Sequence, residues 1–256
     1  GDGAAPSNSS FVCCGIGMDR EIRIECVPRP LTILAVVIRV FARASSPAFG
    51  QRGAPAPPRT PKALAPSDFT GYWVSVITSD WRHRMLAPKK GDYESIPLTP
   101  EGRKLAEAWD PAKDEAAGSS CRAYGAAGII RMPGMLHITW QDENTLRIDT
   151  DAGTQTRLFH FGGTVPQGYQ PQLQGYSVAR WEAPTVSAGI GPRPDLRRLS
   201  GSLEMKTTNM LPGYLRRNGV PYSGNSVLTE YYTRTDEPNG DSLLIVESIV
   251  VDSYLD

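Results

Sequence analysis

The stretch MLHITWQDENTLRIDTDAGTQTRLFHF, residues 135–161, decides the fold class of this chain. It contains three runs in which apolar and polar residues alternate, separated by the polar segments QDEN (141–144) and AG (152–153). Alternation with a period of two is typical of β-strands, and short polar segments between such runs are typical of turns. The stretch therefore predicts a three-stranded β-meander.

Similar runs occur on both sides of the meander and bring the expected number of strands to about nine. They are GYWVSVIT (71–78), GIIRM (128–132), GYSVARW (175–181), GSLEMKTTNM (201–210), NSVLTEYYTRT (225–235) and DSLLIVESIVVD (241–252). A helix is expected from Thr99, as N-cap, and Pro100 to a stop at Pro111. The sequence predicts a mainly β fold, an antiparallel barrel or sandwich with one or two short helices.

The first of these strands starts with the motif DFTGYW (68–73), in which Gly71 precedes Trp73 by two residues. A Gly-x-Trp on the first strand resembles the hallmark of lipocalin-like barrels. There the glycine allows the backbone to bend, and the tryptophan closes one end of the barrel under an arginine from a late strand. Arg234 is the candidate for that arginine. The resemblance favours a lipocalin-like barrel over a sandwich.

A wider resemblance covers residues ~68–255 and is to a large family of exported bacterial proteins of unknown function. The segments TRLFHFGG, GYSVARWE, NSVLTEYYTRT and DSLLIVESIVVD occur in the order typical of that family. The matching residues are Arg157, Leu158, Gly175, Ser177, Trp181, Glu182, Ser223, Glu230 and Asp252, and the departures are Tyr176, Ser226 and Ser253. The resemblance implies export and a β-rich fold, and it implies no activity.

Four regions are expected along the chain. Residues 1–17 look like translated upstream sequence, and residues 18–50 resemble a secretory signal peptide, with arginines before the short apolar run 31–38. That run is too short to span a membrane. Residues 51–68 form a proline-rich linker, and residues 69–256 form a single β-barrel domain. The expected location is secreted or periplasmic, in a bacterium.

Composition excludes several classes of function. The chain has 27 basic and 27 acidic residues, which argues against nucleic acid as the main partner. No dinucleotide or phosphate-binding glycine loop is present, so no cofactor is expected. Cys121 is the one cysteine after residue 50, and the three histidines lack metal-ligand spacing, so no metal site is expected.

Register within the meander predicts which side chains face the barrel interior. A two-residue AG turn pairs Arg147 with Leu158 and Asp149 with Thr156, and a four-residue QDEN turn pairs Trp140 with Thr145. One face then gathers a tryptophan, an arginine, carboxylates and His160, and we expect this face to line the lumen. A slip of one residue in the QDEN turn would move the strand 135–140 to the opposite face.

The leading functional hypothesis is a binding module for a small hydrophobic or amphipathic molecule. Its candidate ligand-binding residues are Trp140, Arg147, Trp73, Trp81 and Tyr231. The alternative is a cofactor-independent lyase, isomerase or hydrolase with His160, Asp149 and Tyr176 as catalytic residues in the lumen, which requires these side chains to converge.

A third hypothesis is an interaction domain, favoured if the barrel is filled and an apolar patch is exposed. Members of the resembling family continue beyond the position of Asp256. If a terminal strand is lacking, we expect an unpaired sheet edge that promotes dimerisation or aggregation.

Overall fold

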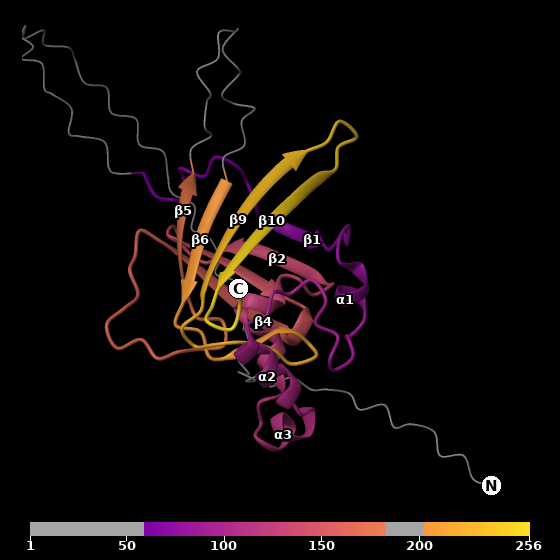
Figure 1. Cartoon of the computed structure of the whole chain (residues 1–256). Helices are drawn as coiled ribbons and strands as arrows, with labels where there is room; N and C mark the ends of the chain where they lie inside the picture. Colours follow the sequence, from indigo (N-terminus) through magenta and orange to yellow (C-terminus); the bar gives the residue numbers. More distant parts are fainter. Residues whose placement is uncertain (1–58, 183–201) are drawn as a thin grey trace, which may run out of the picture. The chain divides into compact units, whose positions relative to one another are not determined.

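Eight strands form one sheet that curls into a nearly closed barrel (Figure 1). The computed structural model describes residues 59–182 and 202–256, so the predicted segments 1–17 and 18–50 and residues 51–58 of the linker lie outside the described residues. The strands, in sheet order, are β1 (Gly71–Val74), β2 (Met135–Trp140), β3 (Thr145–Thr150), β4 (Gln155–Phe161), β5 (Tyr176–Glu182), β6 (Ser202–Thr208), β9 (Val227–Asp236) and β10 (Ser242–Val251). The mainly β barrel predicted from the sequence is confirmed.

The strand pairs are antiparallel except for β4 and β5, which run parallel. The antiparallel barrel expected from the sequence is thus confirmed for most of the sheet, and this pair is the exception. Residues 162–175 form a long connection that brings the chain back before β5 begins, so β5 takes the direction of β4. At the far end of β5, Glu182 is the register partner of Ser202, the first residue of β6.

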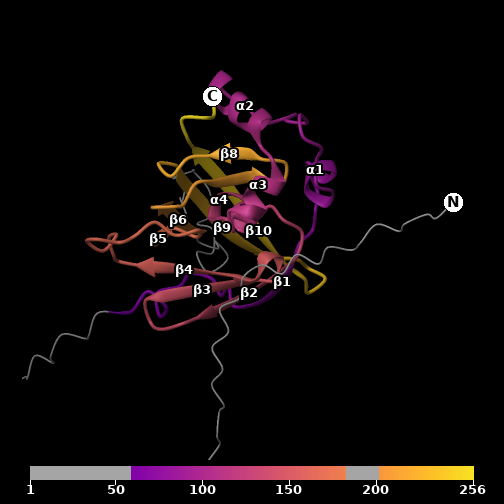
Figure 2. The same ribbon diagram turned by 90° about the horizontal axis from the view of Figure 1, so that it is seen from below.

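Short helices and a small hairpin gather at one end of the barrel (Figure 2). They are α2 (Pro100–Ala108), α3 (Pro111–Ala116), α4 (Ala126–Ile129) and the pair β7 (Gly213–Arg216) and β8 (Val220–Tyr222); α1 (Trp81–Met85) follows β1, and the 3-10 turns are η1 (Ser120–Tyr124) and η2 (Ala152–Thr154). The predicted helix at residue 100 is confirmed, and the Thr99 side chain accepts from the Gly102 amide. GIIRM is not a strand, because residues 126–129 form α4, and Ala126 and Ala127 of this helix pack into an apolar cluster with Tyr222 and Leu228.

The β2–β3 register differs by one residue from the predicted one. Trp140 is opposite Leu146, and His137 is opposite Asp149, whereas the pairing of Arg147 with Leu158 is as predicted. The link between the strands needs one residue more than a four-residue turn, and it is closed by the Gln141 amide donating to the Thr145 carbonyl at 2.9 Å. This places Ile138, Leu146, Ile148, Phe159 and Phe161 on a common inner face.

The barrel interior is filled by side chains. Ile138, Leu146, Ile148 and Phe159 are each 1% exposed or less and pack with Leu203, Met205 and Tyr232 from the opposite wall. On β3 and β4, the predicted lumen face, which carries Arg147, Asp149 and His160, is therefore the outer face, and that part of the prediction was wrong. Burial of the larger apolar set decides the register, because each such side chain contributes about 1.5–3 kcal/mol.

The Gly-x-Trp motif has a glycine with a positive φ and a tryptophan in contact with Arg234. Gly71 has φ +122°, a conformation that side-chain-bearing residues rarely adopt. Trp73 packs against the core, and the Arg234 guanidinium lies 5.8 Å from its ring centroid. Arg234 also donates to the Asp68 carbonyl at 2.5 Å, so β9 is fastened to the start of β1.

Candidate ligand-binding site at helix α1

Helix α1 is a single turn whose two sides differ in chemistry. Asp80 precedes it with φ 53°, and the Asp80 carbonyl accepts from the amides of His83 and Arg84, both at 3.1 Å. Trp81 and Met85 are four residues apart and lie on one side of the turn. His83 and Arg84 line a cavity on the other side. The helix therefore separates an apolar surface from a cationic one.

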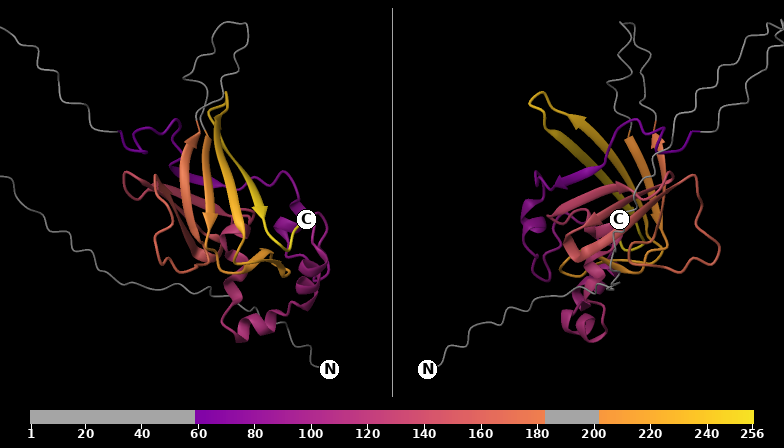
Figure 3. Two further views of the ribbon diagram at one scale, coloured as in Figure 1. Left: turned by 60° about the vertical axis from the view of Figure 1, so that its left-hand side comes forward. Right: turned by 180° about the vertical axis from the view of Figure 1, so that it is seen from behind.

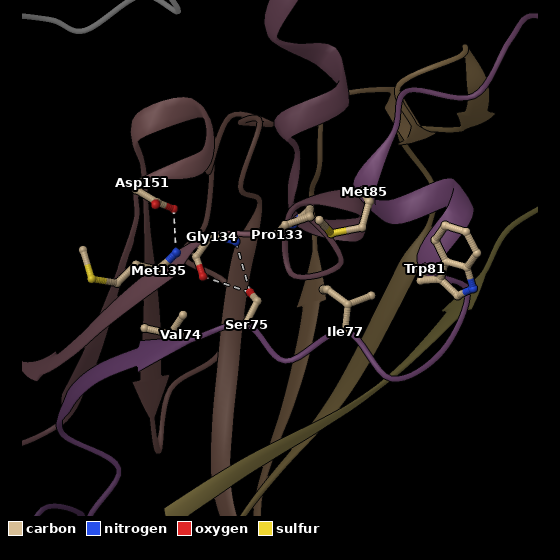
Figure 4. A pocket seen from close by; sticks show the side chains of 9 residues that line it. All are labelled: Val74, Ser75, Ile77, Trp81, Met85, Pro133, Gly134, Met135 and Asp151. Carbon is tan, nitrogen blue, oxygen red and sulfur yellow. Dashed lines mark hydrogen bonds between the residues drawn. The ribbon is translucent and has the colours of Figure 1, made fainter.

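The apolar side opens onto a groove of about 610 Å³, which we call the α1 groove (Figure 4). Its walls are Val74, Ser75, Ile77, Trp81, Met85, Pro133, Gly134, Met135 and Asp151. Trp81 is 65% exposed and Met85 is 54% exposed. Volumes of several hundred Å³ with apolar walls are typical of small-molecule sites.

Hydrogen bonds hold the floor of the α1 groove. The Ser75 amide and hydroxyl donate to the Gly134 carbonyl at 3.0 and 2.9 Å, and the Gly134 amide donates back to the Ser75 hydroxyl at 3.1 Å (Figure 4). The Met135 amide donates to Asp151 at 2.8 Å. A β-carbon on Gly134 would overlap the Asp151 carboxylate, so a larger residue there would have to displace that side chain. The polar groups of the floor are thus occupied, and apolar side chains form the accessible walls.

The cationic side is a small cavity of about 20 Å³, which we call the arginine cluster. Asp80, His83, Arg84, Gly128, Arg131, Met132, Leu215, Arg216 and Arg217 line it. Asp80 accepts from Arg131 at 2.5 Å, from Arg216 at 3.1 Å and from His83 at 2.9 Å. One carboxylate thus faces four arginines in this lining, and the positive charge is in excess.

The pKa shifts in the arginine cluster come first from burial and then from the neighbouring charges. Burial lowers the pKa of the Arg84 guanidinium, and the neighbouring charge of Arg131 lowers it further. Burial also lowers the pKa of Arg216, although Asp80 partly offsets the effect. Burial raises the pKa of Asp80, but the His83 hydrogen bond and the two arginines outweigh burial and lower it overall. An added anion would be stabilised by the same charges.

The α1 groove and the arginine cluster share two structural elements. Arg131 and Met132 line the arginine cluster, and the next three residues, 133–135, line the α1 groove. The Arg84 side chain donates to the Arg131 carbonyl at 2.9 Å and ties α1 to this segment. An apolar wall and a cationic wall therefore lie on two sides of one helical turn.

A possible set of metal ligands lies beside the arginine cluster. His83, Asp92 and Glu94 place one ligand atom each within 4.8 Å of one another. Arg82, however, bonds to Asp92 at 2.6 Å and to Glu94 at 3.3 Å, so a cation would have to displace a guanidinium. His83 also contacts Asp80 and Asp92 through its two ring nitrogens, at 2.9 and 3.2 Å. His83, Asp92 and Glu94 are therefore part of an ion-pair network.

Of the three predicted catalytic residues, His160 and Tyr176 come together, but Asp149 does not join them. His160 stacks on Tyr176 with ring centroids 4.6 Å apart, on the outer face. Asp149 accepts from Arg147 at 2.7 and 2.8 Å and from Thr156 at 2.5 Å. Because of the register, the histidine opposite Asp149 is His137 and not His160. The acid–base pair expected in the lumen is therefore not assembled.

The five predicted ligand-binding residues lie in different places. Trp81 lines the α1 groove. Trp73 and Trp140 pack against the barrel core, and Trp140 lies 5.6 Å from Phe161 between ring centroids. Arg147 is bound to Asp149 on the outer face, and Tyr231 is opposite Glu204 and Glu247. Of these five, Trp81 is the one that lines a described groove.

Sequence reasoning missed a buried ion pair inside the barrel. Arg157 is 1% exposed and donates to both carboxylate oxygens of Glu230, which is fully buried, at 3.3 and 2.7 Å. Thr207 joins Arg157 at 3.4 Å and Ser177 at 2.8 Å. Arg157, Ser177 and Glu230 are all among the residues that carry the family resemblance. The pair could have been found from the alternation of β4, because Arg157 is on the same face of the strand as Phe159 and Phe161.

No protein-family model, curated protein or solved structure matches this chain. Within residues 59–182 and 202–256, none of the helices has the length and apolar character that crossing a membrane requires.

Proposed function

We propose that this domain binds a small amphipathic molecule, with its apolar part in the α1 groove and an anionic group against Arg84 and Arg131. The single observation that carries this proposal is that α1 and residues 131–135 line both surfaces. Apolar contact supplies most of the affinity in such sites, and a few charged groups fix the orientation of the ligand. The nearly closed barrel is compatible with ligand binding.

We also propose that the protein acts after export, in the periplasm or outside the cell. The signal-like segment 18–50 motivates this part of the proposal. Detection of the processed chain in a periplasmic fraction, with its new N-terminus near residue 50, is the expected result. A chain that keeps residues 18–50 in the cytoplasm would contradict it.

The test compares three twelve-carbon probes with different head groups, each below its micelle concentration. Dodecanoate carries an anion, dodecan-1-ol is neutral and dodecyltrimethylammonium is cationic. We expect dodecanoate to bind about tenfold more tightly than dodecan-1-ol, because a charge-assisted hydrogen bond contributes ~1.5–3 kcal/mol. Dodecyltrimethylammonium should bind least. Titration calorimetry on the full chain measures all three.

Variants separate the two halves of the site. Arg131→Gln should weaken dodecanoate about tenfold and leave dodecan-1-ol unchanged, because the charge is lost while the groove remains. Met85→Glu should abolish binding of both probes, because it places a charge in the apolar wall. Arg180→Gln, on exposed β5, is the matched control and should change neither. Equal affinity for the three probes, or failure of all three to bind, would overturn the proposal.

An interaction role is the second candidate, because the barrel core is filled and the walls of the α1 groove are exposed. In that role an amphipathic helix would cover Trp81 and Met85 with its apolar side. A synthetic amphipathic peptide that protects Trp81 fluorescence from iodide quenching, where dodecanoate does not, would favour it. Trp81→Phe identifies the signal.

A further inference from the structure

Strand β10 is an open edge of the barrel sheet. Among the described strands, β9 is the one that pairs with β10, along all ten residues from Ser242 to Val251 (Figure 3). A strand that is paired on one side presents its remaining backbone amides and carbonyls to another strand. β10 contains no proline and no lysine, the residues that often block such an edge.

The outer face of β10 carries an apolar stripe. Leu243, Ile245, Ile249 and Val251 are 42%, 55%, 46% and 65% exposed. The alternate residues Leu244 and Val246 pack against the barrel core instead. The stripe is thus not needed for the core of its own barrel, and its burial by another surface would be favourable.

The stripe is symmetric about Glu247. The positions two residues before and after Glu247 are Ile245 and Ile249, and the positions four residues away are Leu243 and Val251. In an antiparallel pair, residues directly opposite each other share a face. A twofold axis at Glu247 therefore places Leu243 opposite Val251 and Ile245 opposite Ile249 in the second copy.

We propose that two copies of this chain pair antiparallel through β10, with the twofold axis at Glu247. The interface is isologous, because the same edge serves both copies. A register shifted by one residue would place the apolar stripe against the inner-face positions, and this mismatch favours the symmetric register. The occupant is a second copy because the apolar positions of β10 are symmetric about Glu247, so each copy offers the other a matching apolar stripe.

Glu247 regulates the strength of this pairing. At the axis, each Glu247 lies opposite the other, and directly opposed like charges weaken a strand pair. The residue of β9 opposite Glu247 is Tyr231, which carries no positive charge to offset the repulsion. We therefore expect a weak, reversible dimer whose affinity depends on the charge at position 247. This inference is independent of the proposed ligand site, which contains no β10 residue.

The decisive experiment mixes the full-length wild type with Glu247→Lys and measures mass by sedimentation equilibrium across concentration. The wild type and the variant should each form weak homodimers. An equimolar mixture should form a heterodimer roughly threefold to tenfold tighter, since one repulsive pair becomes attractive. Glu247→Gln should tighten the homodimer by about threefold.

Two controls keep the result specific. Glu101→Lys, on exposed α2, makes the same charge change away from β10 and should not alter association. Ile245→Asp with Ile249→Asp should leave a folded monomer, as judged by circular dichroism. A wild type and a mixture that both stay monomeric would overturn the proposal, as would a dimer indifferent to the charge at position 247.

Discussion

Arg157 and Glu230, 73 residues apart in sequence, form a two-point ion pair inside the barrel, next to its apolar core. The pair joins β4 to β9, which are not neighbours in the sheet. Because both charges are out of water, each depends on the other to offset the free energy of its desolvation.

Glu230→Gln should lower the free energy of unfolding by about 3–5 kcal/mol, because Arg157 keeps its buried charge without a partner. Urea denaturation followed by circular dichroism measures this. The double variant Arg157→Leu with Glu230→Leu should recover most of the loss. Glu143→Gln breaks the exposed pair with Lys62 and should cost under about 1 kcal/mol. A similarly small loss for Glu230→Gln would contradict the buried pair.

Gly71→Ala should lower the free energy of unfolding by about 1–3 kcal/mol. A β-carbon there meets no atom within 4 Å, so the cost comes from φ +122° alone. Gly163→Ala is the control, because Gly163 lacks a positive φ and its nearest contact would be the Tyr176 hydroxyl at 3.6 Å. Thermal unfolding compares the two, and equal stability would argue against strain at Gly71.

Arg234→Met should lower the free energy of unfolding by about 1 kcal/mol and alter the Trp73 fluorescence. Methionine keeps much of the length of the side chain but loses the charge over the indole and the bond to the Asp68 carbonyl. A double-mutant cycle with Trp73→Leu isolates the interaction between the two side chains. A coupling free energy near zero would mean that Arg234 and Trp73 contribute independently.

Asp252 should make the fold sensitive to acid. Burial raises the pKa of its carboxyl, but hydrogen bonds from Ser223 and Ser226 outweigh burial and lower the pKa overall. A lowered folded-state pKa stabilises the fold above the ordinary carboxyl pKa of about 4, and this stabilisation is lost as pH falls through the folded-state value.

Asp252→Asn should therefore be less stable than the wild type at pH 7 and should lose less stability between pH 5 and pH 2. Urea midpoints measured across that range give the slope. Glu107→Gln, exposed on α2, is the control and should follow the wild-type curve. Parallel curves for Asp252→Asn and the wild type would show that Asp252 is not the cause of the loss of stability in acid.

Local patterns predicted most elements correctly, because their causes lie within a few residues. The meander alternates with a period of two, and Thr99 and Pro100 start α2 as capping chemistry requires. Arg234 was found through the motif at Gly71 and Trp73, since that motif implies a partner of known type.

The face of the meander was predicted wrongly because both faces mix apolar and polar residues. Leu158 lies on the outer face and Arg157 on the inner one. The residues of the turn between β2 and β3 did not show whether the link has four residues or five. A β2–β3 register with Ile138 opposite Ile148 would have identified the inner face. The α1 groove was beyond reach, because residues 133–135 meet α1 only in the folded chain.

The pairing of Glu182 with Ser202 has a consequence for redesigning the molecule. β5 ends at Glu182 and β6 begins at Ser202, at adjacent points of the sheet, so the two strands can keep their register whatever the length of chain between them. The entropy of closing a loop grows only slowly with its length. A folded module inserted here should therefore be carried at the rim of the barrel, far along the chain from α1, with little effect on folding.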